Sequence, residues 1–299
     1  MLKDLFVSLR PQQWIKNTFI FAALIFAQEL FDFHRILISI AAFAAFCLLS
    51  SAVYLFNDIH DAEADRQHPV KKNRPIAAGR VGRVTALVLS IVLTIASLYT
   101  CFLITRLLFI LAIAYLIQNI LYTFWLKRMA VLDVMCISAG FVLRAAAGGA
   151  AISVEISSWL IICTFFLALF LGLAKRRHEL VLLEANSALH RKTLSDYTPY
   201  LLDQMISIVT TATLLCYVLY TLSEDVQRKL HAHSLYVTIP FVLYGIYRYL
   251  YLIHRNEGST RSGSGPLAGG SPSATLLADK PLLIDVFLWG LTAAAILYL

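Results

Sequence analysis

The sequence predicts an all-α integral membrane protein, a bundle of about nine transmembrane helices with a polar cytoplasmic cap. Three observations predict this class: 59% of the 299 residues are hydrophobic, only 14% are charged, and the mean hydropathy is +0.73. A soluble domain usually carries about a quarter charged residues. A chain with so few charges cannot cover a soluble surface, so its outer face is expected to contact lipid.

Nine apolar stretches are candidates for crossing the hydrocarbon layer, which takes about 20 helical residues. They cover residues 17–34, 36–56, 84–104, 107–125, 133–151, 157–174, 205–223, 234–253 and 282–299. The first stretch is interrupted by Gln28 and Glu29. The residues before it lack the apolar core and cleavage site of a secretory signal, so we expect this helix to be retained. Residues 1–299 are expected to form one transmembrane domain.

The basic residues predict the orientation of these helices. If the N-terminus is cytoplasmic, the loops on that side hold 19 Lys or Arg residues, and the opposite loops hold only 4. Such an excess is typical of cytoplasmic loops. Topology therefore accounts for the net charge of +7, and we expect no nucleic-acid partner.

The loops on the side assigned to the cytoplasm differ in composition. Loops 57–83 and 175–204 mix acids with bases and are expected to form the polar cap. In residues 258–273, ten of sixteen are Gly or Ser, which predicts a flexible loop without chemistry. The five cysteines lie in apolar stretches without a CxxC pair, so neither a disulfide framework nor a zinc site is indicated.

The acidic motif after the second stretch is the strongest sign of chemistry. Its polar residues are Asn57, Asp58, Asp61 and Asp65. If the helix continues, the three aspartates share one face, where they repel each other unless a cation binds them. Mg²⁺ suits such a site because it takes oxygen ligands from carboxylates, water and phosphates. These four residues are therefore the predicted metal ligands and catalytic residues, although a solvated acidic helix end would look similar.

Basic residues in the same loops are candidates for binding phosphate, which Arg contacts through a planar fork and Lys as a point charge. The candidate substrate-binding residues are Lys16, Lys71, Arg74, Tyr122, Lys127, Arg128, Arg144, Lys175, Arg176 and Arg177. Topological charge alone would also explain Lys71. Arg144 lies deep in its span, where it is expected to face either an anion or a buried acid. Residues 175–177 would also complement the dipole at a helix C-terminus.

The spacing Asn57-Asp58-x-x-Asp61-x-x-x-Asp65 resembles the first signature of the UbiA-type intramembrane prenyltransferase superfamily. Within it, the chain is most similar to the decaprenyl-phosphate phosphoribosyltransferase family, up to about residue 255. The matching segments begin with Arg10-Pro11-x-Gln13-Trp14-x-Lys16-Asn17 and continue through 57–65, 74–79, 133–145 and 175–177. One departure from the wider superfamily is the loop after the sixth stretch, which begins KRRHE in place of a second Asp-rich motif.

The resemblance implies a Mg²⁺-dependent enzyme that moves 5-phosphoribose from phosphoribosyl pyrophosphate to a polyprenyl (decaprenyl-type) phosphate and releases pyrophosphate. It also implies a bacterial inner (plasma) membrane protein whose active site faces the cytoplasm. Whether the protein forms a homo-oligomer is left open. The alternative enzyme would move a prenyl group from a prenyl diphosphate to an aromatic acceptor. A transporter is disfavoured because the charges gather at one membrane face.

Overall fold

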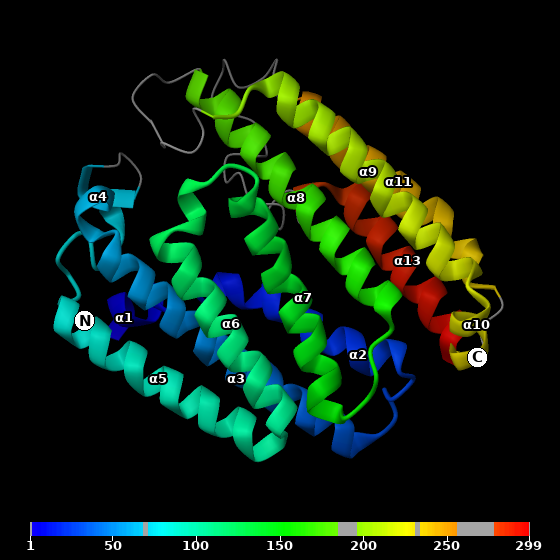
Figure 1. The fold of residues 1–299 in the computed structure, drawn as a ribbon, viewed down its shortest axis with the longest axis horizontal. Coiled ribbons are helices and arrows are strands. Elements are labelled where there is room, and N and C mark those ends of the chain that lie inside the picture. The colour runs from blue at the N-terminus through cyan, green and yellow to red at the C-terminus, as the bar shows by residue number, and fades with distance from the viewer. Residues whose placement is uncertain (1, 68–70, 185–195, 231–233, 256–277, 299) are drawn as a thin grey trace. The chain divides into compact units, whose positions relative to one another are not determined.

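The structure is a computed structural model that describes residues 2–67, 71–184, 196–230, 234–255 and 278–298. Within these residues the secondary structure is helical throughout, without a strand (Figure 1). Eight helices in this part of the chain are long and apolar enough to cross a membrane. The predicted all-α membrane fold is therefore confirmed, while the polar cap stays a prediction. The predicted Gly/Ser-rich loop 258–273 lies outside the described residues.

The chain forms two compact units, and the division falls within helix α7 (Leu132–Ile152). Unit 1 contains Met1–Lys127 and Ala139–Ile156, and unit 2 contains Arg128–Ser138 and Ser157–Leu299. The other helices of unit 1 are α1 (Leu2–Ser8), η1 (Pro11–Ile20), α2 (Phe21–Phe26), α3 (Phe33–His60), α4 (Ala62–Gln67), η2 (Lys71–Asn73), α5 (Arg83–Ile104) and α6 (Arg106–Phe124). Those of unit 2 are α8 (Ser158–Glu184), α9 (Pro199–Leu222), α10 (Glu224–Leu230), η5 (Leu235–Thr238), α11 (Ile239–Arg255) and α13 (Lys280–Tyr298), and η3 (Leu126–Arg128) lies at the division.

The first predicted span, 17–34, is not one helix, and this part of the prediction was wrong. The chain instead forms the 3₁₀ helix η1 and the six-residue helix α2, each too short to cross a membrane alone. The run ends at Gln28, which adopts a φ of 60°, and Glu29 turns to pair with Arg35. Asp32 then caps α3 by accepting hydrogen bonds from the backbone of His34 and Arg35.

Helices α3 and α5 pack closely in unit 1 because small residues line their contact. The hydroxyls of Ser90 and Ser97 on α5 donate to the carbonyls of Ala52 and Ala45 on α3, at 2.9 and 2.7 Å. These bonds satisfy the hydroxyls inside an apolar layer, as is typical of membrane helices. The core beside them is centred on Phe46, which is fully buried.

Glycine brings α7 and η1 together in the same unit. A Cβ atom at Gly148 would lie 2.0 Å from the carbonyl oxygen of Ile20, which is a backbone atom. Only glycine permits this approach. The contact holds η1 against α7, so both helices bring their polar side chains to one place.

Unit 2 has its own core, in which α8 packs on α9 and α11 packs on α13. The rings of Phe170 and Tyr249 meet edge to face, with centroids 5.6 Å apart. A Cβ at Gly172 would lie 2.5 Å from a methyl of Val134, so the first turns of α7 pack closely on α8. Helix α8 continues to Glu184, which places Lys175, Arg176 and Arg177 inside the helix and not at its end as predicted.

Candidate active site

The acidic motif lies at the junction of α3 and α4. Asn57 and Asp58 occupy the last turn of α3, Asp61 follows the helix end at His60, and Asp65 lies on α4. The backbone N–H of Asp61 donates to the carbonyl of Asn57, and that of Asp65 to the carbonyl of Asp61. The helical path therefore almost continues through the break, and Asp58 and Asp65 stay on one face.

Each of the three aspartates is paired with a basic side chain of unit 1. One guanidinium nitrogen of Arg74 lies 3.2 Å from Asp58 Oδ1 and 2.6 Å from Asp65 Oδ2. Arg10 also donates to Asp58, and Lys127 Nζ lies 2.7 Å from Asp61 Oδ1. The carboxylates of Asp58 and Asp65 are almost fully buried, so these pairs are shielded from solvent.

The turn that carries Arg74 is fixed by a small apolar core. Ile76 is buried with Leu55 and Ala62, so the residues after Arg74 are anchored to α3 and α4. Gly79 adopts a φ of 74° and lets the chain turn back toward α5. Arg74 is therefore held between Asp58 and Asp65 by a rigid loop.

The donor set fits a magnesium ion that takes only part of its shell from protein. Among the described residues, no three His, Cys, Asp or Glu side chains gather closely enough to share a metal. Asp58 and Asp65 do converge on the single Arg74 nitrogen, so two carboxylates face one small volume. Mg²⁺ commonly uses one or two carboxylates and completes its shell with water and phosphate. Asp61 is held by Lys127, and the Asn57 side-chain oxygen accepts a hydrogen bond from Thr123.

Arg144 is a buried cation without an acidic partner among the described residues. Its guanidinium donates to the side-chain oxygen of Asn17, the carbonyl of Gly140 and the hydroxyl of Tyr115, each at 2.8 Å. The residue is only 6% exposed. The buried acid considered from sequence is therefore not found in this part of the chain. Neutral acceptors orient the group but leave its charge uncompensated, which favours binding of an anion.

Lys16 on η1 adds a second uncompensated charge. It forms no hydrogen bond or ion pair with any residue that the structure describes. Burial, together with the positive charges of Arg144 and Arg10, lowers the pKa of Lys16 to about 8. Because Arg10 also contacts Asp58, the cationic pair of Lys16 and Arg144 adjoins the acidic motif.

The predicted basic cluster of unit 2 is neutralised by acids. Arg176 bonds Asp133 at 2.8 Å and Glu179 at 2.7 Å, and Arg177 forms two hydrogen bonds with Asp203. Lys175 lies 3.7 Å from Glu179. These pairs give the three bases a structural role, so their assignment to substrate is weaker than that of Lys16 and Arg144.

The remaining predicted residues are less constrained. Lys71 in η2 and Tyr122 on α6 are half-buried. Arg128 in η3 is exposed, and it has no partner within the described residues. Their assignment to substrate stays a prediction.

Three residues of the site were missed in the sequence. Arg10, Asn17 and Tyr115 contact Asp58 or Arg144, although none was selected as a site residue. Arg10 and Asn17 lie in the N-terminal segment that matches the family motif, and this match could have identified them as site residues. Tyr115 lies in an apolar span without any pattern that distinguishes it.

A buried phenol closes the turn before α7 in unit 2. Val131 adopts a φ of 68°, a left-handed conformation that a β-branched residue rarely takes. Its N–H donates to the hydroxyl of Tyr197 at 2.6 Å, and that hydroxyl donates to Asp133 at 3.0 Å. Burial raises the pKa of Tyr197 to about 12, so the phenol keeps its proton.

We expect Tyr197→Phe to destabilise the protein by about 1–3 kcal/mol, because the N–H of Val131 and a carboxylate oxygen of Asp133 each lose a partner. Thermal unfolding in detergent measures the change. Tyr200→Phe is the matched control, since Tyr200 is exposed and its hydroxyl contacts only Gln204 in the described chain. Equal melting temperatures for both variants would show that the Tyr197 hydroxyl does not stabilise the turn before α7.

Comparison with known proteins agrees with this geometry. Residues 17–264 match the model of the UbiA prenyltransferase family. The chain belongs to the UbiA prenyltransferase family. A decaprenyl-phosphate phosphoribosyltransferase of Mycolicibacterium smegmatis is 36% identical, over 100% of this chain and 93% of the relative. The protein of that name from Corynebacterium glutamicum is 34% identical, over 94% and 83%.

Solved structures give the same UbiA fold. A UbiA homologue from Archaeoglobus fulgidus bound to DMAPP and Mg²⁺ superposes with a TM-score of 0.69 over 98% of this chain and 99% of that one. Its sequence is 18% identical, so this likeness concerns the fold alone. The predicted resemblance to the superfamily is confirmed.

Proposed function

We propose that this UbiA-family protein transfers 5-phosphoribose from phosphoribosyl pyrophosphate to a polyprenyl phosphate, with Mg²⁺ as cofactor. The observation that carries the proposal is that two sites of opposite charge adjoin each other in unit 1. Lys16 and Arg144 form a cationic site without an acid, and Asp58 and Asp65 form a dicarboxylate beside it. Relatives across the full chain carry the name of this activity.

In this reaction the main task of the protein is to hold the two anionic substrates in line. An oxygen of the acceptor phosphate attacks the anomeric carbon of the donor, and the bond to pyrophosphate breaks with its electron pair on the leaving oxygen. The acceptor phosphate is already ionised, so no general base is required. Fixed cations counter the repulsion between the substrates and the charge that develops on the leaving group.

Each residue has a part in this arrangement. Asp58 and Asp65 would hold Mg²⁺ with Asn57 and Asp61 beside them, and the ion supplies positive charge to the pyrophosphate when bound. Arg144, fixed by Asn17 and Tyr115, binds a phosphate from inside the bundle. The other candidates for binding donor or acceptor phosphates are Lys16, Arg74, Lys127, Arg128, Tyr122 and Lys71, followed by Lys175, Arg176 and Arg177.

We propose that the protein lies in the bacterial plasma membrane with its N-terminus and active site on the cytoplasmic side. The excess of 19 over 4 basic loop residues supports this orientation.

The test combines purified protein in detergent, Mg²⁺, labelled phosphoribosyl pyrophosphate and a polyprenyl phosphate. We expect label to enter the organic phase and EDTA to stop the transfer. Absence of transfer with every lipid, together with activity on a prenyl diphosphate and an aromatic acceptor, would establish the alternative UbiA chemistry instead.

The lowered pKa of Lys16 predicts a pH dependence. Lys16 is charged below about pH 8 and loses its charge above it, so kcat/KM for the anionic substrates should fall as pH rises through about 8. Lys16→Arg should abolish this fall, because arginine stays protonated. A profile that falls at the same pH in both proteins would exclude Lys16 as the titrating group.

The lowered pKa of Lys16 has the opposite effect on the stability of the ligand-free protein, which should increase with pH. Because the pKa of Lys16 is lower in the folded chain than in the unfolded chain, the unfolded chain binds more protons between about pH 8 and 10.5. The free energy of unfolding should therefore rise with pH over this window.

A further inference from the structure

Exposed basic side chains gather at the end of unit 1 where α1, α4 and the start of α5 lie (Figure 1). They come from these three helices, from η2 and from the turn before α5. We call them the basic patch, which consists of Lys3, Arg66, Lys72, Arg80 and Arg83. The transfer reaction proposed above uses none of these side chains.

Arg80 brings the two lysines of the patch together. Its Nε lies 2.9 Å from Asp4 Oδ1 on α1, and a terminal nitrogen donates at 2.7 Å to the carbonyl of Asn73 in η2. Lys3 and Lys72 directly precede these two partners in the chain. Neither lysine forms an ion pair or a hydrogen bond with any residue that the structure describes. Both ammonium groups are therefore available to a ligand.

The other arginines of the patch are also held in place. Arg66 donates to the carbonyl of Ala77 at 3.0 Å, and it shares the carboxylate of Glu63 with Arg83. About half of each arginine side chain stays exposed, 50% for Arg66 and 49% for Arg80 and Arg83. These contacts orient the guanidinium groups without covering them.

The acids beside the patch do not balance its charge. Asp4 and Glu63 contact its arginines, and both acids stay ionised because hydrogen bonds from Arg80 and Arg83 lower the pKa of the two carboxyls. Five bases against two acids leave an excess of three positive charges. Topology explains why bases lie on this side of the membrane, but not why contacts hold them together in one patch.

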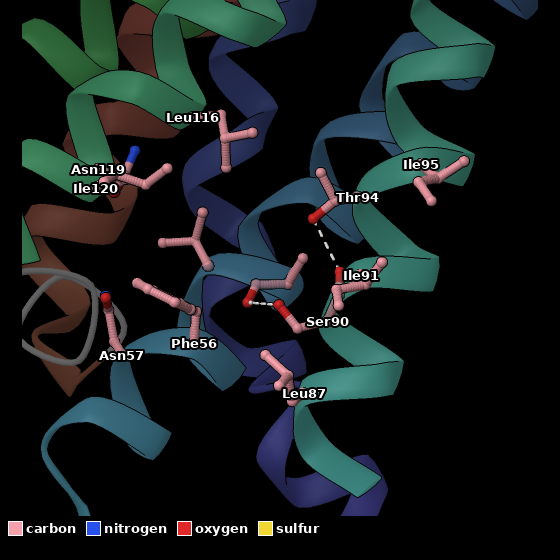
Figure 2. Close-up of a pocket in the computed structure, with 12 residues that line it drawn as sticks. Phe56, Asn57, Leu87, Ser90, Ile91, Thr94, Ile95, Leu116, Asn119 and Ile120 are labelled. Atoms are coloured by element: carbon pink, nitrogen blue, oxygen red, sulfur yellow. Dashed lines mark hydrogen bonds between the residues drawn. The ribbon is translucent and has the colours of Figure 1, made fainter. Parts of the chain in front are cut away.

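Apolar side chains mark the level of the patch relative to the hydrocarbon layer. Val84 is exposed directly after Arg83, and the exposed apolar face of α5 continues through Leu87, Ile91 and Ile95, which follow one another along the helix in Figure 2. On a helix that spans a membrane, such residues contact lipid. The basic patch therefore lies where the hydrocarbon layer ends, at the level of the lipid headgroups.

Helix α1 adds an apolar edge to the patch. Phe6 and Val7 are exposed, while Leu5 packs on the core beneath the patch. The ion pair of Asp4 with Arg80 fixes this helix beside the bases. Exposed aromatic and aliphatic side chains next to bases are typical of a helix that lies in the membrane interface. This edge favours a lipid surface over a soluble acidic protein as the partner.

We propose that the basic patch binds the headgroups of anionic phospholipids in the leaflet on its own side of the membrane. Anionic lipids of the cytoplasmic leaflet attract basic segments that adjoin a membrane span. Guanidinium groups contact a lipid phosphate through paired N–H bonds, and ammonium groups contact it as point charges. The inference goes beyond the proposed function, because the bound phospholipid is not a substrate.

The experiment is a titration of the full chain in detergent with phosphatidylglycerol or phosphatidylcholine, in which native mass spectrometry measures the bound lipid. We expect phosphatidylglycerol to bind more tightly, and salt to weaken its binding. The double variant Lys3→Gln, Lys72→Gln should bind phosphatidylglycerol about 25-fold more weakly, since each base near an anionic surface contributes about fivefold in affinity. Its melting temperature should equal that of the parent protein, because neither lysine contacts a described residue.

The matched control is the double variant Arg106→Gln, Arg228→Gln. It also removes two exposed charges, from loops that the sequence assigns to the opposite side of the membrane. We expect its affinity for phosphatidylglycerol to equal that of the parent protein. Equal affinities for the two lipids, or an equal loss of affinity in the two double variants, would overturn the proposal.

Two competitors test other partners for the patch. Displacement of phosphatidylglycerol by polyglutamate at equal charge concentration would identify an acidic polypeptide as the ligand and overturn the lipid assignment. Displacement by an equimolar amount of polyprenyl phosphate would make the patch part of the substrate site. Because the titration contains no phosphoribosyl donor, it decides the question whether or not the protein transfers phosphoribose.

Discussion

Asp58→Asn should lower kcat/KM for phosphoribosyl transfer by about 100-fold or more. The substitution keeps the size of the side chain and one oxygen that can accept from Arg10 or Arg74. It removes the negative charge that would hold Mg²⁺ and leaves two arginines facing a neutral group. Mutation of residues that merely support metal ligands typically lowers metal affinity or activity about 10–100-fold. Loss of the charge of a ligand itself should lower activity at least as much.

Glu63→Gln is the matched control for Asp58→Asn. Glu63 belongs to the same acidic segment, but its side chain is 71% exposed and pairs with Arg66 and Arg83, outside the site. We expect its activity and melting temperature to stay near those of the parent protein. Measuring kcat/KM across Mg²⁺ concentrations and the melting temperature distinguishes the roles: near-normal activity in a folded Asp58→Asn protein would remove the metal assignment.

Gly148→Ala should lower both the stability and the activity of the protein. The new Cβ would lie 2.0 Å from the carbonyl oxygen and 2.8 Å from the carbonyl carbon of Ile20. These backbone atoms cannot rotate away, so η1 must shift with Lys16 and Asn17. We expect a loss of about 1–3 kcal/mol in stability from the overpacked contact. A displacement of about 1 Å at the phosphate site should also lower kcat/KM roughly 100-fold.

Gly290→Ala makes the same chemical change where there is room. A Cβ at Gly290 on α13 meets no atom within 4 Å, and alanine favours helix. We expect this variant to match or slightly exceed the parent protein in melting temperature, with unchanged kinetics. If Gly148→Ala behaves like Gly290→Ala in both measurements, the packing of η1 does not position the site.

Eight of the spans could be predicted because hydropathy over about 20 residues is a strong local signal. The first span was wrong because its outcome depends on single residues. Arg10 and Gln28 adopt left-handed conformations, with φ values of 53° and 60°. Neither residue type predicts this conformation from sequence, so the two ends of the run that holds η1 and α2 were visible only in the structure.

The candidate site was predictable where the signal was local and not where it depended on distant partners. The acidic motif and Arg74 lie close together in the chain, and the structure brings Arg74 against Asp58 and Asp65. The deep position of Arg144 predicted a partner, but Asn17 and Tyr115 are 127 and 29 residues away and neutral. Asp133 and Asp203 likewise neutralise Arg176 and Arg177 from distant helices, so a basic run in the sequence is not a basic site in the fold.

The pairing of every motif aspartate with a base makes ligand binding an exchange of partners. In the proposed mechanism, Arg10 and Arg74 would have to give up part of their ion pairs with Asp58 and Asp65 before those carboxylates could bind a divalent ion. The released guanidinium groups would then face the phosphates that arrive with the ion. Because each ligand would remove a cost that the other meets alone, we expect cation and donor to bind with positive cooperativity, each raising the affinity of the other by the same factor.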